Sequence, residues 1–119
     1  MNLAKIVQRG WEAVGVGDFD TLVTDYAEEM KFIMPGQADI LKGRQAFRSA
    51  LDGIGEALPP GFEITGLRHI EGGYEVVSIV EWKSDKIVSS QLSVLFKFKG
   101  KKIYEERWFV DTEQWKSAF

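Results

Sequence analysis

Four consecutive segments in the second half of the chain alternate between apolar and polar residues, and they constrain the fold most. They are rich in Val, Ile, Phe and Trp, which favour β-strands, and they span residues 62–71, 74–83, 86–98 and 102–111. Short breaks separate them, and the first break is Gly72-Gly73. A Gly-Gly pair between two alternating runs predicts a hairpin, because both turn residues can adopt positive φ. The segments therefore predict an antiparallel meander of four strands.

The third segment, residues 86–98, predicts that the sheet is curved. A strand of this length would extend roughly 43 Å if it were flat, at about 3.3 Å per residue. A chain of 119 residues has a radius of gyration of only about 13–14 Å. The strand therefore has to bend.

The first half of the chain predicts three helices and one short strand. Residues 3–16 carry an apolar stripe of helical spacing, and Asp18 is expected to cap a second helix over residues 19–27. Residues 31–34 predict a strand that Pro35 ends, and residues 43–58 predict a third helix. The tail predicts one capped turn with Asp111 or Thr112 as its N-cap.

This order of elements predicts an α+β fold in a single domain, residues 1–119, with the helices packed on one face of the curved sheet. A curved sheet wrapped around helices tends to enclose a pocket between its layers. Fifteen aromatic residues are enough to fill a core and to line such a pocket.

Composition excludes several classes of function. The net charge of −3 argues against a nucleic-acid partner, which usually meets a basic face. With no cysteine and only His69, neither a disulfide framework nor a metal site of several histidines or cysteines is expected. No segment is apolar enough to span a membrane and the N-terminus does not resemble a signal peptide, so we expect no membrane partner and a cytoplasmic location.

At the level of motifs, the whole chain resembles the nuclear transport factor 2-like superfamily, the cone-shaped fold of ketosteroid isomerase and of SnoaL-like polyketide cyclases. The motifs that carry the resemblance, in their order along the chain, are Gly17-Asp18, Tyr26-Ala27-Glu28-Glu29, Phe32-Ile33-Met34-Pro35-Gly36, Gly43-Arg44 and Lys101-Lys102-Ile103-Tyr104-Glu105. The resemblance implies a cone in which a curved antiparallel sheet wraps around three N-terminal helices. It does not by itself imply a function, because one fold hosts many.

The resemblance also permits a check of the isomerase chemistry, residue by residue. The family's general base maps to Met34, which cannot carry a proton, and its buried acidic donor maps near Val94. Its tyrosine donor on the first helix maps to Gly10, and only a supporting tyrosine, Tyr26, is retained. An enolising isomerase needs a base and an oxyanion donor, so we expect that this chain is not a ketosteroid isomerase.

The same comparison sets which strand residues face the pocket. The expected wall is mostly apolar and consists of Trp11, Tyr26, Met34, Val76, Ser78, Val80, Trp82, Leu92, Val94, Phe96, Trp108 and Val110. Trp82 and Trp108 could equally be plain core residues. The inward positions of the second and third long strands hold no Asp or Arg, so the Asp–Arg–Asp relay of related epoxide hydrolases cannot be placed.

Glu106 is the candidate catalytic residue. An inward carboxylate among Trp108, Val110 and Phe96 would have a pKa raised by desolvation, which suits a general acid or base. Two alternatives stay open: the strand is rotated and Glu106 is solvated beside Glu105, or Glu106 is buried and paired with an arginine.

Three other polar residues have weaker claims to a function. His69 lies late in the first long strand, where an exposed sheet end is expected, although its ordinary pKa suits catalysis. Arg44 could bind an anionic ligand or pair with Asp39 or another surface acid. Asp111 could be a helix cap, or it could be the acid that SnoaL-like cyclases use near their last strand.

The outer face of the predicted sheet also carries apolar side chains, namely Val77, Ile79, Leu95 and Phe109. A contiguous outer patch usually marks an interface, and family members commonly dimerise through this face. The resemblance therefore implies a homodimer.

Two hypotheses for the function follow. In the first, the pocket binds or converts a small apolar metabolite by acid–base chemistry without a cofactor, as a cyclase, isomerase, dehydratase or hydrolase would. In the second, the protein is a non-catalytic dimer for ligand binding or assembly.

Overall fold

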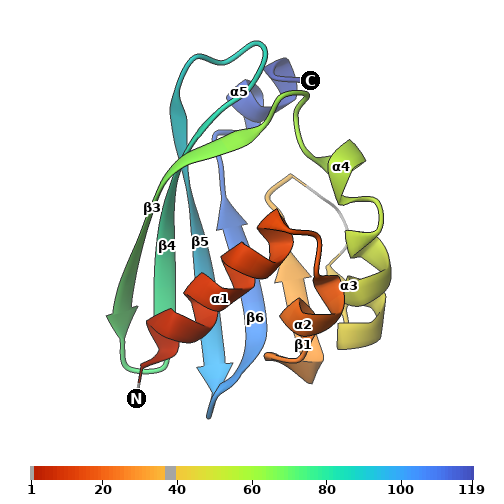
Figure 1. The fold of residues 1–119 in the computed structure, drawn as a ribbon, viewed down its shortest axis with the longest axis vertical. Helices are drawn as coiled ribbons and strands as arrows, with labels where there is room; N and C mark the ends of the chain where they lie inside the picture. Colours follow the sequence, from red (N-terminus) through yellow and green to blue (C-terminus); the bar gives the residue numbers. More distant parts are fainter. Residues whose placement is uncertain (1, 37–39) are drawn as a thin grey trace.

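The computed structural model describes residues 2–36 and 40–119, and these form one six-stranded sheet with helices packed against it (Figure 1). In chain order the elements are α1 (Leu3–Gly15), α2 (Phe19–Val23), β1 (Tyr26–Ile33), β2 (Leu41–Lys42), α3 (Arg44–Leu51), α4 (Ile54–Ala57), β3 (Glu63–Gly72), β4 (Glu75–Lys83), β5 (Ser90–Lys99), β6 (Lys102–Phe109) and α5 (Thr112–Ser117). The predicted α+β class with a curved sheet is confirmed, and the sheet is unclosed.

The strands follow the order β2-β1-β6-β5-β4-β3 across the sheet. The predicted meander is confirmed, because β3, β4, β5 and β6 each pair antiparallel with the next. The sheet as a whole is mixed, however, since β1 runs parallel to β6 and β2 pairs antiparallel with β1. β1 is thus the link between the helical first half of the chain and the meander.

Several predicted boundaries are wrong, each for a local reason. β5 begins at Ser90 rather than at residue 86, because Ser84 closes a turn with Ile87 through two hydrogen bonds, of 2.9 and 3.1 Å. The second helix ends at Val23 instead of residue 27, because Tyr26 already pairs with Ile103 of β6.

The third predicted helix is divided into two. α3 ends at Leu51 and α4 begins at Ile54, with Gly53 as its N-cap. Gly53 and the glycine that follows within α4 weaken the helix. Gly43 precedes α3 as its N-cap, with a φ of +95° that favours glycine.

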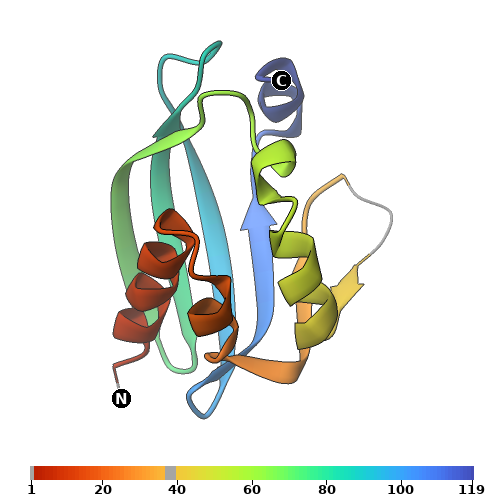
Figure 2. The same cartoon turned by 45° about the vertical axis from the view of Figure 1, so that its right-hand side comes forward.

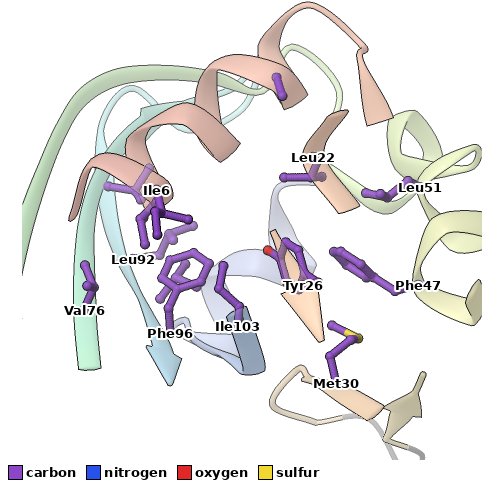
Figure 3. Packing of buried hydrophobic residues seen from close by; sticks show 14 of the residues in the cluster. Ile6, Leu22, Tyr26, Met30, Phe47, Leu51, Val76, Leu92, Phe96 and Ile103 are labelled. Carbon is purple, nitrogen blue, oxygen red and sulfur yellow. The ribbon is translucent and has the colours of Figure 1, made fainter. Parts of the chain in front are cut away.

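The helices lie on one face of the sheet, and α1 crosses β4 and β5 in the view of Figure 1. Figure 2 shows α1 and α3 on either side of α2, with α5 beyond the end of β6. Leu3, Ile6 and Val7 of α1 are buried against the sheet. Figure 3 shows Phe96 and Ile103 of the sheet on one side of Tyr26, and Phe47 of α3 on the other.

Two N-caps expected from the sequence are present. The Asp18 side chain accepts a hydrogen bond from the Thr21 backbone N–H (3.2 Å) at the start of α2. At the start of α5 the Asp111 side chain accepts from the Gln114 backbone N–H (3.1 Å). Both carboxylates satisfy backbone donors that have no partner within the helix.

No helix in the described ranges has the length and apolar character that a membrane crossing requires.

Candidate functional site

A cavity of ≈450 Å³ lies between the sheet and the helices. Its wall takes residues from all five helices and from β1 and β6, so the described elements of the first half and of the tail close over one side of the sheet. The wall is mainly apolar, and a volume of this size falls within the range of about 300–1,000 Å³ for small-molecule sites.

Two carboxyl groups, those of Asp25 and Glu106, belong to this wall; Asp25 is half-buried, whereas Glu106 is only 6% exposed. A β-bulge in β6 directs Glu106 inward: Phe98 pairs with Ile103 and Lys97 with Glu105, so that Tyr104 is the extra residue. Bulges of this kind turn the following side chains to the other face of the sheet. Ile103 and Glu106 are consequently both buried on the helix side.

Two side chains donate hydrogen bonds to Glu106. The Tyr26 hydroxyl donates to Oε1, and the Trp108 indole Nε1 donates to Oε2 at 2.7 Å. Burial raises the pKa of Glu106 above its ordinary value, while these two hydrogen bonds lower it, and burial has the larger effect. Burial and the adjacent Glu106 raise the pKa of Tyr26 well above its ordinary value, so the phenol stays neutral.

Aromatic side chains of the cavity wall surround this carboxyl group. Tyr26 lies 4.8 Å from Phe47, Phe47 lies 5.7 Å from Phe32, and Phe32 lies 6.3 Å from Trp108, measured between ring centroids. Tyr26 and Trp108 are the first and last rings of this series, and both donate a hydrogen bond to Glu106, so the four rings and the carboxyl group form a closed ring of contacts. Glu106 is therefore built into a rigid aromatic frame rather than placed on a mobile loop.

A second polar network holds Trp11, which lines the cavity from α1. Its Nε1 donates to the buried Ser78 hydroxyl at 3.1 Å, and Ser78 Oγ lies 2.8 Å from His69 Nδ1. His69 Nε2 lies 2.7 Å from Gln8 Oε1. Because an amide oxygen only accepts, Nε2 carries a proton, and Ser78 then donates to Nδ1 of the neutral ring. Burial lowers the pKa of His69, which agrees with a neutral ring.

Seven of the residues expected at the site lie on the cavity wall: Trp11, Tyr26, Met34, Phe96, Glu106, Trp108 and Val110. The expectation does not hold for six others, which are buried on the same face but do not line the cavity: Val76, Ser78, Val80, Trp82, Leu92 and Val94. For Val76, Ser78 and Val80 of β4 the reason is that α1 packs directly on β3 and β4. Trp82 packs instead against Phe62 and Trp115, 5.5 and 5.4 Å away.

Both alternatives for Glu106 are contradicted. Glu106 is not solvated, and no arginine lies in ion-pair contact with it in the described chain; Arg107 pairs with Glu105 at 3.3 Å instead. The same strand parity leaves Val77, Ile79 and Leu95 half-buried on the outer face and Phe109 52% exposed there.

The other polar candidates lie away from the cavity wall. His69 is half-buried in the network with Ser78, so the expectation of an exposed sheet end is wrong. Arg44 pairs with a surface acid, Glu28, at 3.5 Å, and Asp39 lies outside the described residues. Asp111 is the N-cap of α5.

Part of the cavity wall was not predicted from the sequence. Phe47, Leu51 and Ile54 line it from α3 and α4, and Trp115 and Phe119 line it from the tail. The apolar spacing of the third predicted helix was a signal for the first three. The tail offered no signal beyond a helix cap, because nothing local shows that α5 folds back over the cavity.

The SnoaL-like domain family matches residues 7–106, which is most of the chain. The chain belongs to this family. A search of curated proteins finds no match. Membership supports a ligand-binding or cyclase-type domain in general terms, and the specific chemistry has to be argued from the site.

Solved structures show the same fold. The Bal32a protein from a soil-derived mobile gene cassette is 24% identical, with a TM-score of 0.82 over 98% of this chain and 95% of that one. A Xanthomonas campestris protein with a cystatin-like fold is 20% identical, with a TM-score of 0.81 over 99% and 97% of the two chains. An NTF2-like protein from Burkholderia xenovorans is 19% identical, with a TM-score of 0.79 over 98% and 95%.

Proposed function

We propose that this SnoaL-like chain binds a small apolar molecule in its cavity and converts it by acid–base chemistry at Glu106 without a cofactor. The observation that carries the proposal is the buried carboxyl group of Glu106 in a mainly apolar cavity of ≈450 Å³. Burial raises the pKa of this group above its ordinary value, which suits a general acid or base. Tyr26 and Trp108 fix its orientation.

The proposed chemistry is not that of a ketosteroid isomerase. Met34 and Gly10 line the cavity where that family places a base and a tyrosine donor, and neither can transfer a proton. Val94, at the position of the acidic donor, is a fully buried apolar residue. We therefore expect the protein to leave a β,γ-unsaturated ketosteroid unchanged.

Binding is tested by filling the cavity. Met34→Trp adds an indole to the wall, whereas Val88→Trp adds one at a position that is 95% exposed and serves as the matched control. Titration with 1-decanol, followed by calorimetry, should give saturable binding to the wild type and to the control, and at least ten-fold weaker binding to Met34→Trp. Equal affinity for all three proteins would contradict the proposal.

Conversion is tested on a molecule that the protein retains. Apolar compounds extracted from purified wild type, and absent from Met34→Trp, are incubated with wild type and with Glu106→Gln. Chemical change with wild type alone supports catalysis by Glu106. Retention without change supports the alternative, a non-catalytic ligand-binding domain.

The proposal includes a homodimer through the outer face of the sheet. Val77 pairs with Leu95 across β4 and β5, and Phe109 is half exposed beside them. The same face carries one positive and one negative side chain, Lys97 and Glu105, which lie 3.7 Å apart. In a two-fold symmetric dimer, the lysine of one copy can therefore face the glutamate of the other. Light scattering should give a mass of about twice 13.5 kDa and a monomer for Phe109→Lys. A wild-type monomer at micromolar concentration would contradict the dimer.

A cytoplasmic location stays a prediction, which cell fractionation would test.

A further inference from the structure

The Glu106 carboxyl group lacks a cationic partner among the described residues. The half-buried carboxylates of the described chain have one: Asp25, which also lines the cavity, is 2.7 Å from Arg9, and Glu105 is 3.3 Å from Arg107. Glu106 is more deeply buried than either and has no ion pair with any described residue. Buried charges are normally paired, so this site lacks the group that would normally accompany its charge.

The hydrogen bonds at the site define what an occupant must supply. Trp108 Nε1 can only donate, and its hydrogen goes to Oε2; the single hydroxyl hydrogen of Tyr26 goes to Oε1. An ionised carboxylate has about four acceptor positions, and these two donors leave about two of them open. The ionised site therefore presents acceptors, and a group that binds there has to be a hydrogen-bond donor.

The surrounding rings favour a donor with a positive charge. Tyr26, Phe47, Phe32 and Trp108 form the closed series around Glu106, and Trp11 lies 6.2 Å from Trp108. All five line the cavity. Aromatic faces carry negative potential and attract a cation within about 6 Å of the ring centroid, more strongly when water is excluded.

We propose that the occupant is an apolar molecule with a protonated amine, and that its ammonium group contacts Glu106 inside this aromatic frame. The inference rests on the proposed function, because it names the class of molecule that the cavity takes. The ammonium donates to the open acceptor positions of Glu106, and its charge favours the ionised form of the carboxyl group.

A neutral alcohol in the same place donates a hydrogen bond but brings no charge. A carboxylate brings a charge of the wrong sign and no donor. The lysine of the cavity wall, Lys116, is exposed on α5 beyond the end of β6, where solvent screens it from Glu106 (Figure 1).

Three ligands with one tail and different head groups test the inference. Decylamine, 1-decanol and decanoate are titrated separately into the full chain at pH 7.5. Decylamine and decanoate are kept below their micelle concentrations and 1-decanol below its solubility limit, and binding is followed by calorimetry and tryptophan emission. Decylamine should bind at least ten-fold more tightly than 1-decanol, and decanoate at least ten-fold more weakly than 1-decanol.

Glu106→Gln removes the charge and keeps the shape. Its amide oxygen can accept from Trp108, and its amide nitrogen can donate to the Tyr26 oxygen. We expect the preference for decylamine over 1-decanol to fall below three-fold in this variant. Glu81→Gln, an exposed position on the outer face of β4, makes the same charge change outside the cavity, and it should keep the full preference.

The outcomes separate the inference from the function on which it rests. If 1-decanol or decanoate binds as tightly as decylamine, the ammonium is wrong while the cavity still binds apolar molecules. If none of the three binds, the proposed function fails as well. Should Glu106→Gln not fold, as circular dichroism would show, the three head groups on the wild type still decide the inference.

Discussion

Removal of the Tyr26 hydroxyl should destabilise the protein by an amount that depends on pH. In the native state this hydroxyl donates to the buried Glu106 carboxyl group, and it lies on a side chain that is only 3% exposed. Tyr26→Phe keeps the ring against Phe47 and deletes only the donor. The cost is then the loss of one buried hydrogen bond, and its size depends on whether Glu106 is charged.

The expected magnitude follows from the two states of Glu106. A hydrogen bond to a neutral group contributes about 0.5–1.5 kcal/mol, and one to a charged group about 1.5–3 kcal/mol. Tyr26→Phe should therefore cost about 1 kcal/mol at pH 4 and about 2–3 kcal/mol at pH 8. In a domain of this size each kcal/mol lowers the melting temperature by roughly 3–6 °C.

The sign of the pH dependence follows from the raised pKa of Glu106. Below the unfolded pKa of about 4.3, both states are protonated and Glu106 costs nothing. As pH rises, the unfolded chain releases its proton first, so the folded state loses stability until pH passes the folded pKa. Tyr26→Phe removes a hydrogen bond that lowers the pKa of Glu106 in the folded state. The folded-state pKa therefore rises further, and the loss of stability with rising pH becomes larger.

Urea denaturation at pH 4, 6 and 8 and at one fixed protein concentration measures these differences. In the Glu106→Gln background, Tyr26→Phe should cost about 1 kcal/mol at every pH. Tyr74→Phe, at a tyrosine that is 62% exposed, should cost nothing measurable. A Tyr26→Phe effect that is the same at pH 4 and pH 8 in the wild-type background would refute the account of Glu106 as a buried titrating group.

Three further predictions concern the stability of the scaffold and can be measured by urea or thermal denaturation. Ser78→Ala should cost about 1–3 kcal/mol, because it leaves the Trp11 indole N–H without its acceptor; a loss below 0.5 kcal/mol would contradict the network. Gly61→Ala should lower the stability of the folded protein, because the φ of +76° at this position disfavours a side chain and a Cβ would lie 2.1 Å from Asp85 Oδ1. Gly55→Ala is the control: the space around Gly55 is open, so this change should be neutral or stabilising. Asp111→Ala should cost about 0.5–2 kcal/mol through the lost cap of α5, and an unchanged midpoint would show that the cap contributes nothing.

The sequence predicted the meander well because its signal is local. Alternation fixes which residues of β4 and β5 share a face, and Gly72-Gly73 marks the first hairpin. The parallel pairing of β1 with β6 could not be predicted in this way. Its partners, such as Phe32 and Glu106, are far apart in the chain, and no periodicity within either segment encodes the pairing.

The candidate site also has a part that local sequence patterns predict and a part that they do not. The inward position of Glu106 and of Trp108 follows from strand parity, and both line the cavity. Whether an inward residue meets the cavity or the core depends on where α1 rests. Val80 of β4 therefore shares the parity of Glu106 but is covered by α1, whereas Phe119 lines the cavity through the position of α5. Helix placement is a tertiary property that no single segment determines.

The most direct test is a pH titration of Glu106 itself, by NMR of the side-chain carboxyl carbon, with Glu106→Gln to assign the signal. We expect a pKa above the ordinary value of about 4.3 in the free protein, because burial outweighs the hydrogen bonds from Tyr26 and Trp108. We also expect this pKa to change when decylamine binds to the wild type. In Met34→Trp, whose cavity is filled, the addition of decylamine should leave the pKa of Glu106 unchanged. An ordinary pKa that no ligand changes would contradict a buried carboxyl group at the centre of a binding site.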